Sequence, residues 1–418
     1  MSEIVNRVRA LCVSARGAAA SVANADGALR NAALGEMADA IVREKDKILA
    51  ANREDLARAE ENGVPHVMLD RLTLTDARVR GIADGVRALV ALPDPLTEVS
   101  RVTRPSGITI VEKRVPFGLI AMIYEARPNV TADAAAIAIK SGNAVVLRGG
   151  KEAICTNRAT VAVLKNALAA VGISPDAVAL VEDTERESAT ALLSMRGLVD
   201  LLIPRGGKGL IQSCVENAKV PIIETGAGNC HIYVDAEADL EKALAVAINA
   251  KCQRPSVCNA AESLLCHRAV AREFLPVFFA RTREWGLSLR GCPATCEILS
   301  EAEPATAEDF YTEFNDFVMS VKIVDSVAEA VAHINETGTR HSEAIVTENA
   351  ETAAYFMSRV DAAAVYHNAS TRFTDGGEFG LGAEIGISTQ KLHARGPMGT
   401  EALTTTKYFV TGNGAIRK

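Results

Sequence analysis

The chain has 418 residues, 48% of them hydrophobic and 4% aromatic, so it can bury large cores built mainly from Ala, Val, Leu and Ile. That length exceeds one ordinary domain and predicts two or three. A formal net charge of −7 without any block of Lys and Arg argues against nucleic-acid binding, and the lack of 18 successive apolar residues argues against a transmembrane helix.

The first hundred residues have the pattern of amphipathic helices. Leu34, Met37, Ala38, Ile41 and Val42 recur at the spacing of one helix face. Further helices are predicted over residues 48–63 and 75–93, and prolines at positions 93 and 95 close this helical segment.

From residue 104 the pattern changes to strands. Residues 104–118 alternate between apolar and polar side chains and predict an extended ribbon. Strands are then predicted over 118–124, 143–148, 176–182, 198–204 and 220–224, with helices between them over 132–142, 152–172, 185–195 and 207–218. Short apolar runs that alternate with helices indicate a parallel sheet covered on both faces.

A second alternating set follows. Its strands are predicted over 231–235, 262–267, 317–324, 344–347 and 362–366, and its helices over 240–250, 270–284 and 327–335. The glycine-rich segment 368–399 is expected to form loops. Residues 403–411 predict a Thr-rich strand that leaves an unpaired edge unless it meets another chain.

Nine cysteines in a chain without the order of a signal peptide favour reduced thiols and a cytoplasmic protein. Three of them, Cys252, Cys258 and Cys266, stand close together before His267. Gaps of five and seven residues fit poorly with the tight pairs of structural zinc sites, so we expect no metal. Cys252 and Cys266 are expected in the core, whereas Cys258 lies on a loop between a helix and a strand. For Cys258 a nucleophile and an inert thiol both stay open.

Two glycine-rich turns follow predicted strands. Gly206, Gly207, Lys208 and Gly209 open a helix, where backbone N–H groups can approach a phosphate. Two glycines at the end of another strand lie between two cations, Arg148 and Lys151, which suit the extra phosphate of NADP. Because such glycines often form only turns and such cations often lie only on the surface, a nucleotide site and its absence both stay open.

Long segments of the chain resemble one known family. The order VPFGLIAMIYEARPNVTADAAAIAIKSGNAVVLRGGKEA, PRGGKGLIQ, ETGAGNCHIYVD and KCQRPSVCNAAESLL is similar to the aldehyde dehydrogenase superfamily. Within it the chain resembles the gamma-glutamyl phosphate reductases, and the resemblance extends through HINETGTRHSEAI, NASTRFTDGGEFGLGAEIGIST and HARGPMGTEALTTTKYF. It covers residues 106 to 418, and the helical N-terminus is compatible with it.

The resemblance implies roles for individual residues. Cys258 matches the thiol nucleophile, Asn129 the amide that stabilises the oxyanion, and Glu224 the glutamate that activates water in hydrolytic members. For NADPH, the matching residues are Arg148 and Lys151 near the adenosine ribose, Gly206, Gly207, Lys208 and Gly209 beneath the pyrophosphate, and Glu313 near the nicotinamide ribose. For the substrate, Arg372 is the first candidate to bind the α-carboxylate in a two-pronged geometry. Arg127, His341 and Ser342 are further candidates.

The resemblance also implies an architecture and a reaction. We expect an aldehyde dehydrogenase-like α/β fold with two parallel-sheet domains and a β-ribbon oligomerisation arm. Residues 1–103 and 119–228 would form the NADP-binding domain, 229–367 the catalytic domain, 368–397 active-site loops returning towards the cofactor domain, and 104–118 with 398–418 the arm. The reaction is the NADPH-dependent reduction of L-glutamyl 5-phosphate to L-glutamate 5-semialdehyde and phosphate through a Cys258 thioester, the second step of proline biosynthesis from glutamate.

The expected partners are the small-molecule substrate, further copies of the chain in a homo-oligomer, and glutamate 5-kinase in a transient association. Neither nucleic acid nor membrane is expected. Two rival functions remain, a hydrolytic aldehyde dehydrogenase and an oligomeric binding protein without turnover. Phosphate dependence separates the first rival, and an NADP reduction assay separates the second.

Overall fold

The computed structural model describes residues 2–64, 66–125 and 127–417, with backbone but not side chains for residues 66–68 and 208. The chain forms two compact units, each described by itself. Unit 1 contains Met1–Thr225, Gly380–Gly386 and Met398–Lys418, and unit 2 contains Gly226–Phe379 and Ile387–Pro397. Within the described residues no helix is long and apolar enough to cross a membrane.

Unit 1 begins with the predicted helical segment. Its helices are α1 (Glu3–Ala23), α2 (Gly27–Arg43), α3 (Lys45–Glu61), α4 (His66–Leu72) and α5 (Asp76–Ala91). Ser2, Asp26 and Thr75 stand directly before α1, α2 and α5, and each side-chain oxygen accepts a backbone N–H of the first turn. These caps explain where the helices start, because the first N–H groups of a helix have no partner within it.

A four-stranded parallel sheet forms the centre of unit 1, in the order β5-β4-β3-β6. Its strands are β3 (Leu119–Tyr124), β4 (Ala144–Arg148), β5 (Val178–Leu180) and β6 (Leu201–Arg205), with α6 (Pro128–Lys140), α7 (Ile154–Ala170), α8 (Arg186–Leu193) and α9 (Lys208–Asn217) between or after them. All six residues of β3 are buried, as expected for a sheet covered on both faces. The predicted parallel sheet is confirmed.

The predicted strand over 220–224 is wrong. Only an isolated bridge joins Ile222 to Leu202 of β6. Pro221 has no N–H to donate to a ladder, and its carbonyl accepts the N–H of Leu202 at 2.9 Å. The apolar run therefore packs as an irregular segment, a case in which a short run does not decide the secondary structure.

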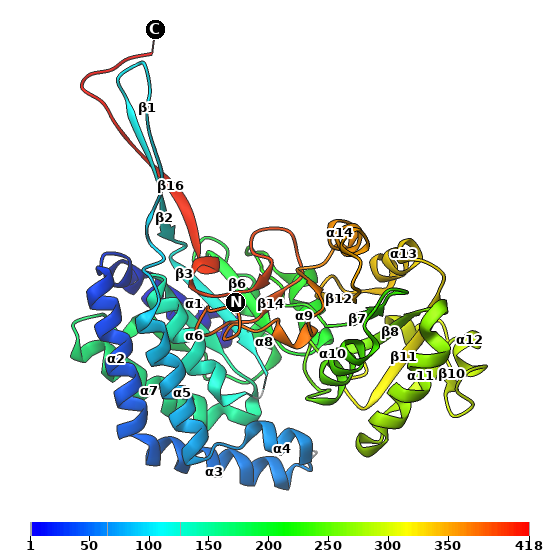
Figure 1. Cartoon of the computed structure of the whole chain (residues 1–418). Coiled ribbons are helices and arrows are strands. Elements are labelled where there is room, and N and C mark those ends of the chain that lie inside the picture. The colour runs from blue at the N-terminus through cyan, green and yellow to red at the C-terminus, as the bar shows by residue number, and fades with distance from the viewer. Residues whose placement is uncertain (1, 65, 126, 418) are drawn as a thin grey trace. The chain divides into compact units, whose positions relative to one another are not determined.

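A three-stranded antiparallel sheet completes unit 1, in the order β1-β2-β16 (Figure 1). Its strands are β1 (Glu98–Thr103), β2 (Thr109–Pro116) and β16 (Thr404–Thr411). The predicted ribbon corresponds to β2, but β1 was not predicted because every one of its residues is exposed and no apolar face marks it. One edge of β16 pairs with β2 of the same chain, and its other edge pairs with no strand among the described residues, so the expected pairing with another chain stays a prediction.

Unit 2 contains a seven-stranded parallel sheet in the order β10-β9-β11-β8-β7-β12-β13. The strands are β7 (Cys230–Val234), β8 (Ala261–His267), β9 (Ser288–Gly291), β10 (Glu303–Pro304), β11 (Val318–Val324), β12 (Ser342–Val346) and β13 (Ala364–His367). The helices are α10 (Leu240–Cys252), α11 (Arg268–Thr282), α12 (Pro293–Cys296), α13 (Val327–Thr337) and α14 (Ala350–Arg359). A short antiparallel pair, β14 (Ile387–Ser388) and β15 (Gly396–Pro397), also belongs to unit 2.

Short 3₁₀ turns connect these elements. They are η1 (Lys151–Ala153), η2 (Pro175–Ala177), η3 (Arg283–Trp285), η4 (Glu308–Tyr311), η5 (Thr371–Phe373) and η6 (Thr400–Leu403). Together the two parallel sheets and the small antiparallel sheet confirm the predicted fold class.

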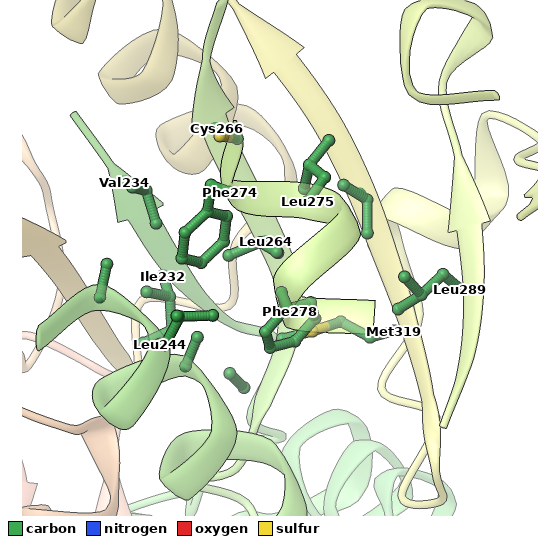
Figure 2. Close-up of a cluster of buried hydrophobic side chains, with 14 of the residues drawn as sticks. Ile232, Val234, Leu244, Leu264, Cys266, Phe274, Leu275, Phe278, Leu289 and Met319 are labelled. Atoms are coloured by element: carbon green, nitrogen blue, oxygen red, sulfur yellow. The ribbon is translucent and has the colours of Figure 1, made fainter. Parts of the chain in front are cut away.

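The core of unit 2 lies between its sheet and helices α10 and α11 (Figure 2). Ile232 and Leu264 on adjacent strands belong to one buried hydrophobic cluster. The stacked rings of Phe274 and Phe278 on α11 belong to it as well. Cys266 is fully buried in the same cluster, and Cys252 is also one of its buried members. The prediction that these two cysteines pack in the core is confirmed.

Candidate active site

The predicted nucleophile, Cys258, lies in residues 253–260, here called the nucleophile turn, which joins the end of α10 to the start of β8. Cys258 lies in it half-buried and outside any disulfide. Lys251 on α10 and Glu262 on β8 form a fully buried ion pair at the base of the turn. Burial raises the pKa of Glu262 to about 7, although the Lys251 ammonium opposes the rise. Because loss of either partner would leave a buried charge unpaired, the ion pair fixes the ends of the turn.

Gly228 packs directly on the backbone of Cys258. A Cβ at this glycine would lie 1.4 Å from the Cys258 carbonyl oxygen, so only glycine fits. The N–H of Gly228 donates to the Glu313 carboxylate at 2.7 Å. Glu313 was predicted near the nicotinamide ribose. In unit 2 its carboxylate orders the segment beneath the nucleophile, and the ribose contact stays a prediction.

Asn259, the residue after Cys258, ties the turn to the segment of Arg372. Its side-chain amide donates to the backbone oxygens of Arg372 and Thr374 at 3.3 and 2.9 Å, and its own carbonyl accepts the Thr371 hydroxyl at 2.7 Å. The Arg372 guanidinium donates from Nη1 to the Asn259 side-chain oxygen and from Nε to Gln253 at 2.9 Å. Arg372, predicted from the sequence as a substrate residue, therefore lies against the nucleophile turn.

A cavity of about 300 Å³ opens beside this contact. It is lined by Asn249, Gln253, Arg372, Phe373, Asp375 and Glu378. Burial, followed by repulsion from the Arg254 guanidinium, lowers the pKa of Arg372. A negatively charged ligand would relieve that repulsion.

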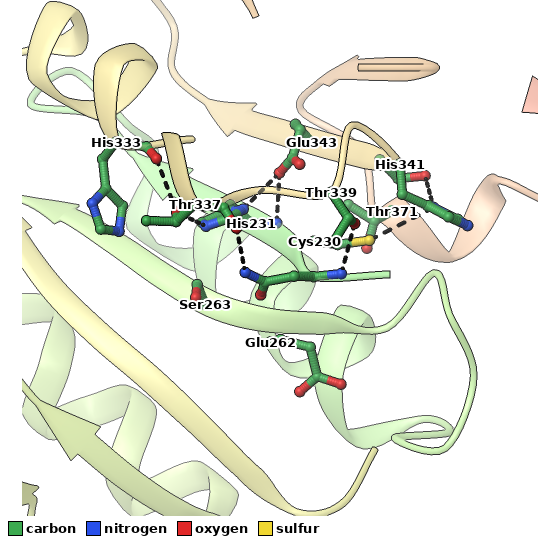
Figure 3. Close-up of polar contacts among 12 residues, drawn as sticks. Cys230, His231, Glu262, Ser263, His333, Thr337, Thr339, His341, Glu343 and Thr371 are labelled. Carbon is green, nitrogen blue, oxygen red and sulfur yellow. Dashed lines mark hydrogen bonds and ion pairs between the residues drawn. The ribbon is translucent and has the colours of Figure 1, made fainter. Parts of the chain in front are cut away.

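Behind the nucleophile turn lies a buried polar cluster (Figure 3). The Cys230 thiol donates to the Cys258 carbonyl at 3.3 Å, and burial raises the pKa of Cys230 well above its ordinary value. His341 and Ser342, predicted as substrate candidates, are fully buried and bonded to each other at 2.8 Å. The Ser342 hydroxyl also bonds to Thr374 at 2.7 Å. Both residues support the strand behind the turn, and their contact with substrate stays a prediction.

The same cluster holds the start of β7. His231 donates its backbone N–H to Glu343 at 2.7 Å, and its Nδ1 lies 2.9 Å from the same carboxylate oxygen. Burial raises the pKa of Glu343. The Asn229 amide donates to the carbonyls of Phe310 and Thr337 at 2.8 and 3.0 Å. These contacts fix the segment that begins at Gly228, against which the Cys258 carbonyl packs.

The predicted phosphate loop lies in unit 1, where β6 leads into α9. Gly207 caps α9, and its N–H donates to the Glu125 carboxylate at 3.0 Å. A Cβ at Gly206 would lie 2.7 Å from the Glu125 side chain. The Lys208 side chain lies outside the described part of the chain, and a Cβ at Gly209 would meet open space. Because this helix start already binds a carboxylate, its N–H groups fit an anionic pyrophosphate.

The two predicted cations at the end of β4 differ in their surroundings. Arg148 donates from Nη2 to the backbone carbonyls of Thr184 and Glu185 at 2.7 and 3.2 Å, and burial lowers its pKa. Lys151 is exposed at the start of η1. Arg148 therefore holds the segment before α8, whereas Lys151 is accessible to an anion in solution.

Asn129 lies exposed in the first turn of α6, after Arg127 at the helix N-cap. Its amide donates to the Asp133 carboxylate at 3.0 Å. Burial raises the pKa of Asp133 to about 6. Glu224 is half-buried and, like Asn129, belongs to unit 1. The oxyanion role of Asn129 and the role of Glu224 stay predictions.

Sequence reasoning missed several of these residues. Glu125 directly follows β3, and polar residues at the carboxyl end of a parallel strand are a signal of function. Lys251 and Glu262 are charges within otherwise apolar patterns, which signals a buried pair. Gly228 carries no signal in the local sequence, because glycine is required there only by the contact with Cys258, 30 positions later.

Comparison with known proteins gives one consistent result. The model of the aldehyde dehydrogenase family matches residues 4–290 and 309–407. The chain is 56% identical to the gamma-glutamyl phosphate reductase of Streptococcus suis over 93% of this chain and 94% of the relative. It is 55% identical to that of Moorella thermoacetica over 97% of both chains.

A solved structure agrees. The crystal structure of gamma-glutamyl phosphate reductase from Thermotoga maritima matches with a TM-score of 0.96 and 45% identity, covering 98% of this chain and 100% of that chain. The chain therefore belongs to the gamma-glutamyl phosphate reductases, which are NADPH-dependent enzymes of the aldehyde dehydrogenase family.

Proposed function

We propose that this chain reduces L-glutamyl 5-phosphate to L-glutamate 5-semialdehyde and phosphate, in proline biosynthesis from glutamate, by way of a thioester on Cys258. The observation that carries the proposal is the nucleophile turn. A half-buried thiol stands on backbone that is held by a buried ion pair, by Gly228 and by Asn259. Such a rigid turn suits covalent catalysis, which needs the sulfur in one position.

The proposed reaction forms a thioester and then reduces it. The Cys258 thiolate attacks the C5 carbonyl, a C–S bond forms, and the bond from C5 to the phosphate oxygen breaks with release of phosphate. Bound NADPH supplies the hydride that the thioester carbon receives. The C–S bond then breaks, the sulfur recovers its electron pair, and the semialdehyde leaves. A thioester suits this sequence because its carbon remains electrophilic.

The tetrahedral adducts carry a negative oxygen that needs donors. In the proposed mechanism the Asn129 amide and the Cys258 backbone N–H donate to it, and each such donor is worth about 3 kcal/mol in the transition state. The Asn129 amide donates one N–H to Asp133 in this structure, and its second N–H is the one proposed to reach the substrate oxygen. The amide stands at the start of α6, where the helix dipole also favours negative charge.

The cofactor residues are proposed from their chemistry. The backbone of Gly206, Gly207 and Gly209 would hold the pyrophosphate at the start of α9, where Gly207 donates to a carboxylate in this structure. Lys151 would meet the 2′-phosphate, with Arg148 shaping the strand end. Glu313 would orient the nicotinamide ribose with the carboxylate oxygen that does not hold Gly228. Lys208 belongs to the same proposal.

Glu224 is proposed not to act as a general base. Phosphate, not water, is the partner of this acyl group, and an activated water would waste the thioester as glutamate. Replacement Glu224→Gln should therefore lower phosphate-dependent turnover by far less than the roughly 10²–10⁴-fold expected for loss of a general base. A loss in that range, with folding and NADPH binding intact, would assign proton transfer to Glu224.

The function is tested by following NADP reduction with L-glutamate 5-semialdehyde, with and without inorganic phosphate. The proposed acyl-phosphate chemistry requires phosphate to release the thioester, so turnover without phosphate should fall to background. Equal rates in both conditions would identify a hydrolytic aldehyde dehydrogenase instead. No reduction in either condition would favour a binding protein.

The proposed assembly is a homo-oligomer, at least a dimer, formed through the open edges of the antiparallel sheet. Val99 on β1 and Tyr408, Phe409 and Val410 on β16 are exposed apolar side chains on this sheet. Deletion of residues 403–418 should give monomers or aggregates by light scattering, and an unchanged native mass would refute this assembly. We place the enzyme in the cytoplasm, in transient association with glutamate 5-kinase.

A further inference from the structure

The cavity beside Arg372 combines opposite charges in a small volume. Its lining has one guanidinium, the carboxylates of Asp375 and Glu378, the amides of Asn249 and Gln253, and the ring of Phe373. A volume of about 300 Å³ is at the lower end of small-molecule sites. A cation and two anions around one opening match a zwitterion better than a simple anion or cation.

Arg372 is fixed in a direction that leaves donors for a ligand. Among the described residues, the Arg372 side chain donates only two hydrogen bonds. Nε donates to Gln253, and Nη1 donates to Asn259. The Nη2 group therefore remains for a carboxylate. The nearby Arg254 guanidinium repels Arg372, and an anion bound at Arg372 would offset that repulsion.

The two carboxylates lie on one tight turn that follows Arg372. Asp375 Oδ1 accepts the N–H groups of Gly377 and Glu378 at 2.8 and 3.4 Å, which orients the Asp375 carboxylate. Asp375 and Glu378 are both exposed, and neither forms an ion pair within the described residues. Asp375 interacts electrostatically with the Arg372 guanidinium but forms no ion-pair contact with it, so both carboxylates can still bind a ligand that brings its own positive charge.

The cavity lies close to the proposed nucleophile. Arg372, which lines it, contacts the side chain of Asn259, the residue next to Cys258, and its guanidinium interacts electrostatically with the Cys258 thiolate. In a glutamyl chain, three carbon–carbon bonds separate C5 from the α-carbon, about 4 Å when extended. A substrate whose C5 meets Cys258 can therefore place its α-carbon groups near Arg372.

We propose that this cavity is the subsite for the amino-acid end of the substrate, in which Asp375 and Glu378 bind the α-ammonium group while Arg372 binds the α-carboxylate. The proposal rests on the proposed function and adds the residues that distinguish an α-amino acid from other aldehydes of the same length. These two carboxylates set specificity without taking part in the covalent steps.

The test compares two substrates that differ only in the amino group. L-Glutamate 5-semialdehyde and 5-oxopentanoate are each oxidised with NADP and phosphate by the full-length wild type, Asp375→Asn and Glu378→Gln. Each variant should lose about 10- to 100-fold in kcat/KM for the amino substrate, mainly through KM, with less than about 3-fold change for 5-oxopentanoate. The ratio of the two kcat/KM values is the decisive quantity.

The variants are chosen to keep the turn folded. Asn at position 375 keeps an oxygen that accepts the N–H groups of Gly377 and Glu378. Glu273→Gln, an exposed charge loss on α11 of the same unit, is the matched control and should leave the ratio unchanged. Circular dichroism and the Tm of each variant are measured beside the kinetics.

Each outcome decides the proposal. A fall in the ratio with both variants, and none with the control, supports the ammonium subsite. Equal losses on both substrates, or an unchanged ratio, overturn it, because a structural role does not distinguish an amino group. Wild-type enzyme that turns over neither substrate refutes the proposed function itself, and the subsite falls with it.

Discussion

Two turns of this chain each contain a glycine that packs tightly against another residue. One glycine contacts a side chain, and the other contacts backbone. At the cofactor loop of unit 1, Gly206 packs against the side chain of Glu125. At the nucleophile turn of unit 2, Gly228 packs against the backbone carbonyl of Cys258. A side chain can change its rotamer at small cost, whereas backbone bonded at both ends cannot move without its neighbours.

The difference follows from what each turn has to do. The nucleophile turn must hold one sulfur in one place, and Asn259, Lys251 and Glu262 fix it from both ends. The proposed cofactor loop would have to take up and release an anionic ligand, and the Glu125 carboxylate that contacts it is exposed. In the proposed mechanism, the chain therefore combines a rigid covalent site with an adjustable anion site.

The first prediction concerns the sulfur that the rigid turn holds. Cys258→Ala should reduce turnover to background, because no other group forms the thioester, while NADPH binding measured by fluorescence stays intact. Cys252→Ala and Cys266→Ala should keep most activity and lower stability by about 1 kcal/mol, as modest core changes do. Normal activity in Cys258→Ala would remove the covalent mechanism.

The second prediction compares the effects of replacing the two glycines with alanine. Gly228→Ala places a Cβ at 1.4 Å from the Cys258 carbonyl oxygen, so the turn must shift. We expect at least about a 100-fold loss of activity and a loss of stability of about 3 kcal/mol or more. Gly206→Ala meets the flexible ends of Glu125 and Leu210 and should cost about 1 kcal/mol, with KM for NADPH raised and kcat kept.

Measured thermal unfolding and the split between kcat and KM decide this comparison. Equal effects of the two glycine substitutions would show that the cofactor loop is as rigid as the nucleophile turn. A small loss of activity and stability in Gly228→Ala would show that the turn and its carbonyl can shift. The nucleophile turn would then be no more rigid than the proposed cofactor loop.

The sequence predicted the elements that are marked by local pattern. Apolar runs gave most strands of both parallel sheets, and Cys258 was placed on a loop because a helix and a strand flank it. Strand β1 was missed because all its residues are exposed, and residues 220–224 were mistaken for a strand although Pro221 interrupts the ladder. Pattern alone carries little information about elements that lack a buried face.

Contacts between distant segments could not be predicted in the same way. Glu125 meets Gly207 over 82 positions, and Asn259 meets Arg372 over 113. The residue types at these positions are compatible with many partners, and only the packed strands bring them together. Resemblance to a family supplied the candidate residues Asn129 and Glu313, but not their present partners, which come from the structure.

The third prediction assigns different roles to the two cations of the proposed cofactor site, Lys151 and Arg148. Lys151 is exposed, so Lys151→Ala should raise KM for NADPH about 10-fold or more and leave KM for NADH nearly unchanged. Arg148 holds the carbonyls of Thr184 and Glu185, so Arg148→Ala should weaken both cofactors and lower the Tm. Replacement of both should raise KM for NADPH far more than for NADH. Equal losses for both cofactors in Lys151→Ala would exclude a contact with the 2′-phosphate.

The last prediction has the smallest expected effect and concerns Glu125, the carboxylate at the proposed cofactor loop. Glu125 accepts the N–H of Gly207, which the proposed pyrophosphate also needs, so carboxylate and cofactor compete for one donor. Glu125→Gln removes the negative charge and keeps an oxygen that accepts this N–H. We expect KM for NADPH to fall about 2- to 5-fold at low ionic strength, and the difference from wild type to shrink as salt screens the charge. A higher KM in the variant would mean that Glu125 orders the loop for the cofactor, and the side chain at Gly206 would then be as fixed as the backbone at Gly228.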